Sequence, residues 1–252
     1  MGITDQKYRY RPTPQMSASQ IAEYLYATST RRKRIIREAR FQKNSVGALY
    51  NGARDGLVDF LNDGSRSLSH LTNATDHLEK REKRPDATDW LRRDSRSSIE
   101  ALDAFIKAYN KLGFSKFDCF RVVGKQPHLD PWKTTRISVN LDVTIRKPTQ
   151  GNHGLVGGAI FLFSKGEAST KARVERCKVI AGLIYTFCGH HLKEMGDADP
   201  SLCLAVDVFA RASHRPPGTF AAKLKNVEDA CEEIASRWKT ILPPDDYDGP
   251  EP

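Results

Sequence analysis

The clearest pattern in the chain is an alternation of apolar and polar side chains over residues 136–146. Its apolar positions are Ile137, Val139, Leu141, Val143 and Ile145. A period of two predicts a β-strand with one buried face, and Asp142 falls on the opposite, polar face. Residues 159–163 form a continuous apolar run, which predicts a strand buried on both faces, with Lys165 just beyond its end. Shorter strands are expected at 117–123 and at 202–209, the second carrying Asp207.

Helical spacing of apolar residues recurs between these strands. It predicts helices over residues 17–40, 48–61, 97–112, 171–187 and 226–238. Ser17 with Gln20, and Ser97 with Glu100, have the spacing of capping boxes. Residues 28–30 can divide the first helix into two. The charge-dense stretch 64–95 fits either a solvated helix or an inserted segment, and its sequence does not choose between them.

The order of these elements predicts the fold class. A helix, three strands, a helix and a strand indicate an α/β protein with a mixed central sheet flanked by helices, preceded by an N-terminal helical region. We expect a basic helical region over residues 1–95, an α/β core over 96–242, and an acidic, disordered tail over 243–252.

Composition narrows the cellular setting. The 252 residues are 39% apolar, which is enough for one sizeable core. No apolar run is long enough to span a membrane, and residues 1–14 lack the apolar stretch of a secretory signal. The five cysteines are widely spaced without a CxxC motif, so we expect them to be reduced core residues. A cytoplasmic protein without membrane contact is expected.

Basic residues are concentrated near the start of the chain. The net charge is +9, and residues 1–50 alone carry ten Lys and Arg against three acidic residues. Six of these cations are Arg31, Arg32, Lys33, Arg34, Arg37 and Arg40. They span most of a helix circumference, and their mutual repulsion indicates an anionic partner. Nucleic acid, with DNA as the expected form, is favoured over an acidic protein surface.

The N-terminal segment and the element order together resemble a known superfamily. Residues 17–25 read SASQIAEYL. This is similar to the S-x-S-x-L-x-x-Y-L opening of RecB-type and CRISPR-associated exonucleases, which have the PD-(D/E)xK nuclease fold. The Cys-Pro-Arg turn that follows in those proteins is replaced here by residues 27–32. The cysteine that can bind an iron–sulfur cluster in some members is therefore missing.

The resemblance implies a metal site at the ends of the core strands. In the superfamily, an Asp on the second strand and an acid-x-Lys on the third hold one or two magnesium ions. Asp142 matches the first acid and Lys165 the lysine, but the second acid position is Phe163. Glu167 or Asp207 could supply the missing carboxylate. No histidine matches the N-terminal metal ligand of the family.

Three functions follow from these observations. The first is a nucleic-acid-binding protein on a degenerate, non-cleaving nuclease scaffold without cofactor, in a mobile-element or anti-phage defence setting. The second is a deoxyribonuclease dependent on Mg or Mn, with Asp142, Lys165 and Glu167 as catalytic residues and Asp142, Glu167 and Asp207 as metal ligands. The third is a non-catalytic subunit that binds an acidic protein. No oligomeric state is predicted.

Overall fold

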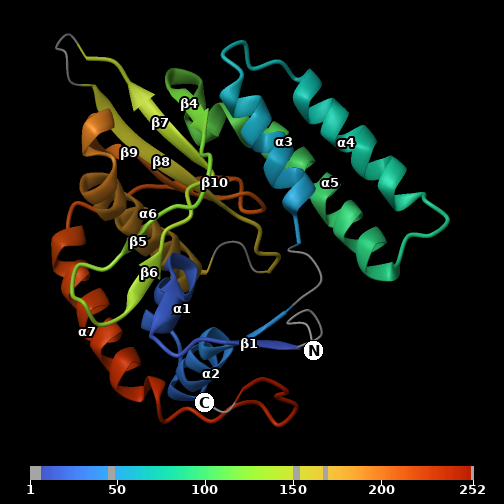
Figure 1. Cartoon of the computed structure of the whole chain (residues 1–252). Coiled ribbons are helices and arrows are strands. Elements are labelled where there is room, and N and C mark those ends of the chain that lie inside the picture. Colours follow the sequence, from blue (N-terminus) through green and yellow to red (C-terminus); the bar gives the residue numbers. More distant parts are fainter. Residues whose placement is uncertain (1–6, 45–48, 150–153, 167–169, 251–252) are drawn as a thin grey trace. The chain divides into compact units, whose positions relative to one another are not determined.

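The structure is a computed structural model that describes residues 7–44, 49–149, 154–166 and 170–250 (Figure 1). The chain divides into two compact units, each built from separate stretches of sequence. Unit 1 comprises residues 1–47, 126–140 and 218–252, and unit 2 comprises residues 48–125 and 141–217. The division therefore does not follow the boundary expected after residue 95. The helices just before that boundary belong to the same unit as the large sheet.

Unit 2 is built on a mixed five-stranded sheet. Its strands are β4 (Asp118–Arg121), β7 (Val143–Lys147), β8 (Leu155–Leu162), β9 (Asp197–Asp207) and β10 (Ala212–His214), in the order β10-β9-β8-β7-β4. β4, β7 and β8 pair antiparallel, whereas β8 and β9 are parallel. Helix α6 (Lys171–His191) makes the crossover between the parallel pair and packs against both strands. Thr170 is its N-cap, so it starts at Lys171 as predicted, and it ends at His191, four residues after the predicted end at residue 187.

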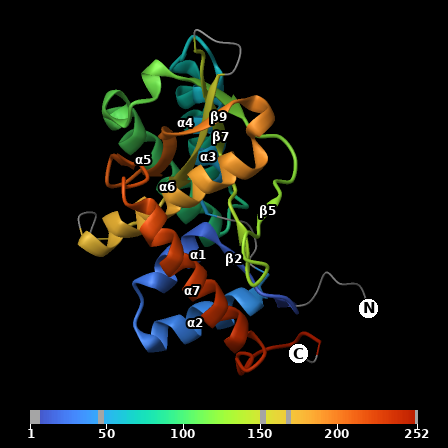
Figure 2. The same cartoon turned by 90° about the vertical axis from the view of Figure 1, so that its left-hand side faces the viewer.

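Three further helices belong to unit 2. They are α3 (Asn51–Asn62), α4 (Ser69–Glu82) and α5 (Asp89–Leu112), and a short 3-10 turn, Phe114–Lys116, leads from α5 to β4. Leu202, Leu204 and Val206 of β9 share one core with α3 and α5, while α6 packs on the sheet from the other side (Figure 2).

The start of α5 differs from the prediction. Thr88 is its N-cap, because the Thr88 hydroxyl accepts a hydrogen bond from the Leu91 N–H. Ser97 consequently lies inside the helix. The undecided segment 64–95 is thus the helical hairpin of α4 and the first turns of α5.

The described residues of unit 1 form two small sheets and three helices. β1 (Tyr8–Tyr10) pairs with β3 (Phe41–Lys43), and β6 (Arg136–Ser138) lies between β2 (Gln15–Ser17) and β5 (His128–Leu129). The helices are α1 (Ala18–Leu25), α2 (Ser29–Arg40) and α7 (Phe220–Trp238). The capping box at Ser17 and the break before Ser29 are confirmed, while α7 begins six residues before the predicted start at residue 226.

The alternating stretch 136–146 is divided between the two units. Residues 136–138 form β6 of unit 1, and residues 143–147 form β7 of unit 2. The five apolar positions are all buried, so the alternation itself is confirmed. The prediction of one continuous strand is wrong. A period of two shows that the backbone is extended and that alternate residues are buried, but it does not require that all of them belong to one sheet.

The acidic tail was expected to be disordered, and its described part is not. Asp248 accepts a hydrogen bond from the Lys7 N–H at 2.7 Å, and Asp246 accepts one from the Tyr8 hydroxyl at 2.6 Å. The Tyr247 ring packs edge-on against Phe41, with ring centroids 4.9 Å apart. Residues 243–250 therefore pack against the two-stranded β1–β3 sheet, where Asp246 and Asp248 accept hydrogen bonds from Lys7 and Tyr8.

The mixed α/β class is confirmed, and so is the burial of the cysteines. All five are buried and form no disulfide. Within the described ranges, no helix combines the length and the apolar character needed to cross a membrane.

Candidate functional site

The candidate site lies along the edge of the unit 2 sheet at which the central strands β8 and β9 end, and not at an edge strand. Because β8 and β9 are parallel, their carboxyl ends meet at the same edge, which is where open α/β sheets bind ligands. β7 runs antiparallel to β8, so its start lies at this edge too, and the Asp142 N–H donates to the Ala159 carbonyl at 2.8 Å. The sheet thus brings Asp142, Phe163, Lys165 and Asp207 to one edge.

Both oxygens of the Asp142 carboxylate accept a hydrogen bond from the protein. Its Oδ1 accepts a hydrogen bond from Nη1 of Arg54, on α3, and its Oδ2 accepts one from the Phe161 N–H at 2.6 Å. Only 8% of the Asp142 side chain is exposed. Burial raises the pKa of Asp142, and the Arg54 charge opposes this shift. A metal cation at Asp142 would have to displace the Arg54 guanidinium.

The Asp207 carboxylate is held in a similar way. Arg173, on α6, donates to it from both Nε and Nη2, the second contact being 2.6 Å long. The Ala210 N–H completes its contacts at 3.0 Å. The side chains of Arg173 and Asp207 are 8% and 2% exposed, so this is a buried bidentate ion pair. Arg173 also donates to the Ser164 carbonyl at 2.6 Å, which ties the end of β8 to the end of β9.

Lys165 points toward helix α5. Its Nζ donates to the Glu100 carboxylate and to the Ser97 hydroxyl, and it lies 5.4 Å from the centre of the Phe209 ring. Its candidate partner in catalysis, Glu167, lies outside the described residues. Across the described part of the chain, no three His, Cys, Asp or Glu side chains are grouped to hold a metal. The two described acids, Asp142 and Asp207, do not fit a shared divalent cation, because each is held by an arginine instead.

Aromatic side chains surround Phe163, the position at which the resemblance leads us to expect a second acid. Phe163 stacks on Tyr50 with ring centroids 4.9 Å apart and planes 8° apart, and the Arg54 guanidinium lies 5.0 Å from the Phe163 ring. Tyr50 precedes α3 with a left-handed backbone (φ 68°), and its N–H donates to the buried Asp94 at 2.8 Å. Sequence reasoning missed Tyr50 and Arg54, since neither stands in a recognisable pattern with Asp142.

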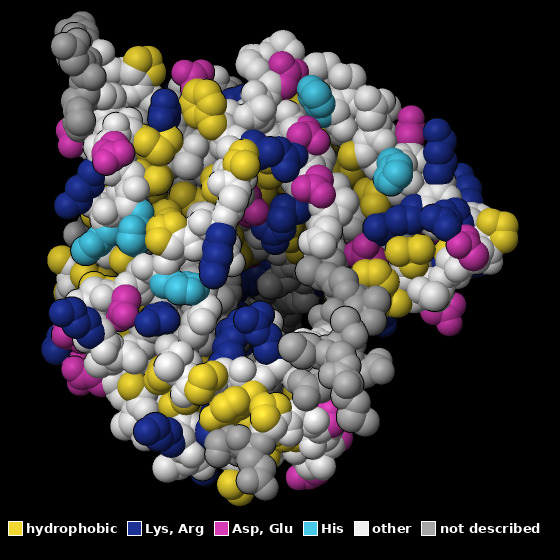
Figure 3. Space-filling model, viewed as in Figure 1, with side chains coloured by type: hydrophobic (Ala, Val, Ile, Leu, Met, Phe, Trp, Pro, Cys, Tyr) yellow, Lys and Arg dark blue, Asp and Glu magenta, His cyan; other side chains and the backbone are white. Residues whose placement is uncertain are grey.

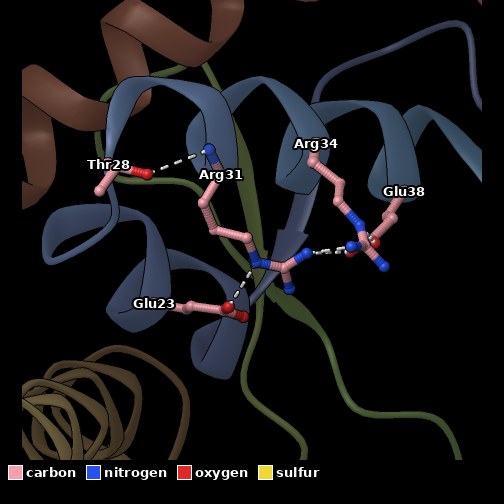
Figure 4. A network of polar contacts seen from close by, with 5 residues as sticks. All are labelled: Glu23, Thr28, Arg31, Arg34 and Glu38. Carbon is pink, nitrogen blue, oxygen red and sulfur yellow. Dashed lines mark hydrogen bonds and ion pairs between the residues drawn. The ribbon is translucent and has the colours of Figure 1, made fainter.

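The second candidate surface is helix α2 of unit 1, and much of its charge is used internally. Arg31 donates to Glu23 at 2.8 Å and to Glu38 at 3.2 Å, and Arg34 donates to Glu38 at 2.6 Å (Figure 4). The Arg32 guanidinium lies 5.0 Å from the Tyr24 ring.

The far end of α2 differs from its middle. Arg40 is only 4% exposed and donates to the carbonyls of Trp238 and Ile241, both at 2.8 Å, at the end of α7. It therefore does not lie on the surface. Lys33 and Arg37 are exposed and have no acidic partner among the described residues. Together with Arg34, whose side chain is 71% exposed, they form the outward cationic face of α2.

No protein-family model matches the sequence, and no curated protein matches it significantly.

Proposed function

We propose that this protein binds nucleic acid through contacts to phosphate and does not cleave it. In this proposal, unit 2 is a degenerate core of the PD-(D/E)xK type. The element order of unit 2 supports this proposal, because it is the helix–strand order that the resemblance implies. That order is α5, β4, β7, β8, α6, β9, and its four strands belong to one sheet.

The observation that carries the absence of cleavage is the Arg54–Asp142 pair. Metal-dependent cleavage of a phosphodiester needs a cation held by several oxygen ligands, which orients water and offsets charge on the phosphate. At this edge a guanidinium holds the carboxylate, and Phe163 stands where a second acid is expected. Arg54 can attract a phosphate, but it cannot generate a hydroxide nucleophile.

The support for nucleic-acid binding is an excess of positive charge in unit 1. Its described residues carry 16 Lys and Arg against 10 Asp and Glu. The outward cationic face of α2, formed by Lys33, Arg34 and Arg37, presents three of these charges on adjacent turns. Lys and Arg side chains also recur over much of the visible surface in Figure 3. Such a surface favours phosphate contacts that depend on salt rather than on base sequence.

The first test is binding of fluorescent single- and double-stranded DNA, measured by anisotropy between about 50 and about 200 mM salt. We expect affinity to fall steeply with salt. The triple variant Lys33→Gln, Arg34→Gln, Arg37→Gln should lower the slope of log K against log salt for duplex DNA by about 0.9 per lost contact. A matched control removes Lys133, Arg136 and Lys239, which lie elsewhere in unit 1, and should keep the wild-type slope.

Two outcomes would overturn the proposal. Absence of binding to either DNA at the lowest salt would remove nucleic acid as the ligand. Cleavage of DNA in the presence of Mn²⁺ that is lost in Asp142→Ala would show an active nuclease instead.

A further inference from the structure

An open pocket of about 480 Å³ lies along the first half of helix α5, within unit 2. Its α5 side chains follow the spacing of one helix face. Three of them are basic, Arg92, Arg93 and Arg96, and two are acidic, Asp89 and Glu100. Lys165, at the end of β8, lines it from the sheet. Lys and Arg side chains gather where α4 ends and α5 begins in Figure 3. None of the three arginines belongs to a motif singled out in the sequence.

The positive charges in this pocket are only partly balanced. Arg96 donates to Glu82 at 2.6 Å, and Lys165 is paired with Glu100. Arg92 uses its Nε for the Ala87 carbonyl at 3.1 Å and has no acidic partner among the described residues. Arg93 is exposed and likewise has no acidic partner in the described ranges. Two guanidinium groups are therefore available to one ligand.

When no anion is bound in the pocket, repulsion among the three arginines destabilises helix α5. Arg92 and Arg93 are four and three residues from Arg96, and like charges at these spacings destabilise a helix. Asp89 and Glu82 offset only part of this repulsion, because these three arginines outnumber them. An anion bound between the arginines would remove this repulsion. Guanidinium groups match the geometry of phosphate oxygens and bind them with paired hydrogen bonds.

We propose that this pocket binds a phosphate group. Resting on the proposed function, we infer that the group is a phosphate of the nucleic-acid strand. The pocket is larger than inorganic phosphate alone needs and lies within the usual size range for small-molecule sites. The Ser97 hydroxyl, which accepts a hydrogen bond from Lys165, can direct its own hydrogen to a phosphate oxygen.

The direct test is calorimetric titration of the full chain with inorganic pyrophosphate. Arg92→Gln with Arg93→Gln should weaken pyrophosphate binding at least tenfold. The control Lys107→Gln with Lys111→Gln removes the same charge from the same helix outside the pocket and should bind as the wild type does. Arg93→Gln alone, at an exposed position, provides a second variant that retains the Arg92 contact to Ala87. Absence of pyrophosphate binding, or equal loss in pocket and control variants, would overturn the proposal.

A second arm asks which phosphate the pocket receives, using short single-stranded DNA with and without a 5′-phosphate. A preference for the 5′-phosphate that disappears in the pocket variant identifies a strand end. Equal weakening of both oligonucleotides identifies an internal phosphate. DNA binding that is unchanged in the pocket variant would overturn the strand assignment. If pyrophosphate binds in the pocket but no DNA binds at all, the proposed function fails while the phosphate pocket remains.

Discussion

Replacing Arg173 by methionine is expected to destabilise unit 2 by about 3–5 kcal/mol, the usual cost of removing one partner of a buried ion pair. The contacts justify a value in this range. Arg173 and Asp207 are 8% and 2% exposed, so water cannot replace the lost donors without opening the sheet edge. Of its described hydrogen bonds, the Asp207 carboxylate would keep the one from the Ala210 N–H, and the Ser164 carbonyl would lose the hydrogen bond from Arg173.

The size of this effect matters because a domain is typically stable by only about 5–15 kcal/mol. Removing the charge of both partners should restore part of the lost free energy of unfolding. We expect Arg173→Met with Asp207→Asn to be more stable than Arg173→Met alone, since no buried carboxylate is then left unpaired. The control is Arg176→Met, which makes the same substitution on the same helix at a residue with no hydrogen bond to Asp207 among the described contacts, and it should change stability by less than about 0.5 kcal/mol.

Urea unfolding followed by circular dichroism gives the free energies of unfolding, and hydrogen exchange of β8 and β9 locates the loss in unit 2. A destabilisation below about 1 kcal/mol, or one matched by Arg176→Met, would refute the ion pair as a major stabilising contact. The ion-pair assignment would also be refuted if Mn²⁺ raised the melting temperature of the wild type but not that of Asp207→Asn. That result would show Asp207 as a metal ligand.

Three further predictions test other parts of the structure. Arg40→Met should lower the stability of unit 1 by about 2–4 kcal/mol in urea unfolding followed by tryptophan fluorescence, because several carbonyls at the end of α7 lose a charged donor. Gly157→Ala should cost at least about 1–3 kcal/mol and speed hydrogen exchange in β9, because its Cβ would lie 2.3 Å from the Leu202 carbonyl oxygen. The hydrogen bond from Lys7 lowers the pKa of Asp246 to about 2, so the stabilising contact is present above the ordinary pKa of 3.8 and is lost as the pH falls through about 2. NMR signals of the neighbouring Tyr247 ring should follow this titration.

Each of these predictions has a matched control. Arg37→Met, on an exposed position of α2, should leave stability nearly unchanged, and a loss equal to that of Arg40→Met would contradict the role of the buried contacts. Gly64→Ala meets no atom within 4 Å and should be tolerated, whereas wild-type stability in Gly157→Ala would contradict the close strand approach. Asp246→Asn should abolish the acid titration of the Tyr247 signals, and a titration that persists would point to another group.

Local features of the fold were predictable because they depend on neighbouring residues. The capping box at Ser17 and the break before Ser29 are set by side chains within three or four positions of the backbone groups that they cap. The burial of alternate residues over 136–146 also followed from the sequence. Its division between two sheets did not, because strand partners are chosen by the rest of the fold. The ordered tail was missed for the same reason, since Lys7 and Asp246 are 239 residues apart.

The two acids of the candidate site could be predicted from the sequence, but the arginines that pair with them could not. Asp142 and Asp207 stand at strand ends, where the element order alone directs attention. Arg54 is 88 residues from Asp142, and Arg173 is 34 residues from Asp207, and a single arginine on a helix carries no signal of its own. Yet these arginines decide what the carboxylates can do. A cation binds where negative charge is uncompensated, and here each carboxylate already has a positive side chain within hydrogen-bonding distance. The uncompensated charge of the described protein is instead positive, on α2 and in the α5 pocket, and an anion is the ligand that this balance favours.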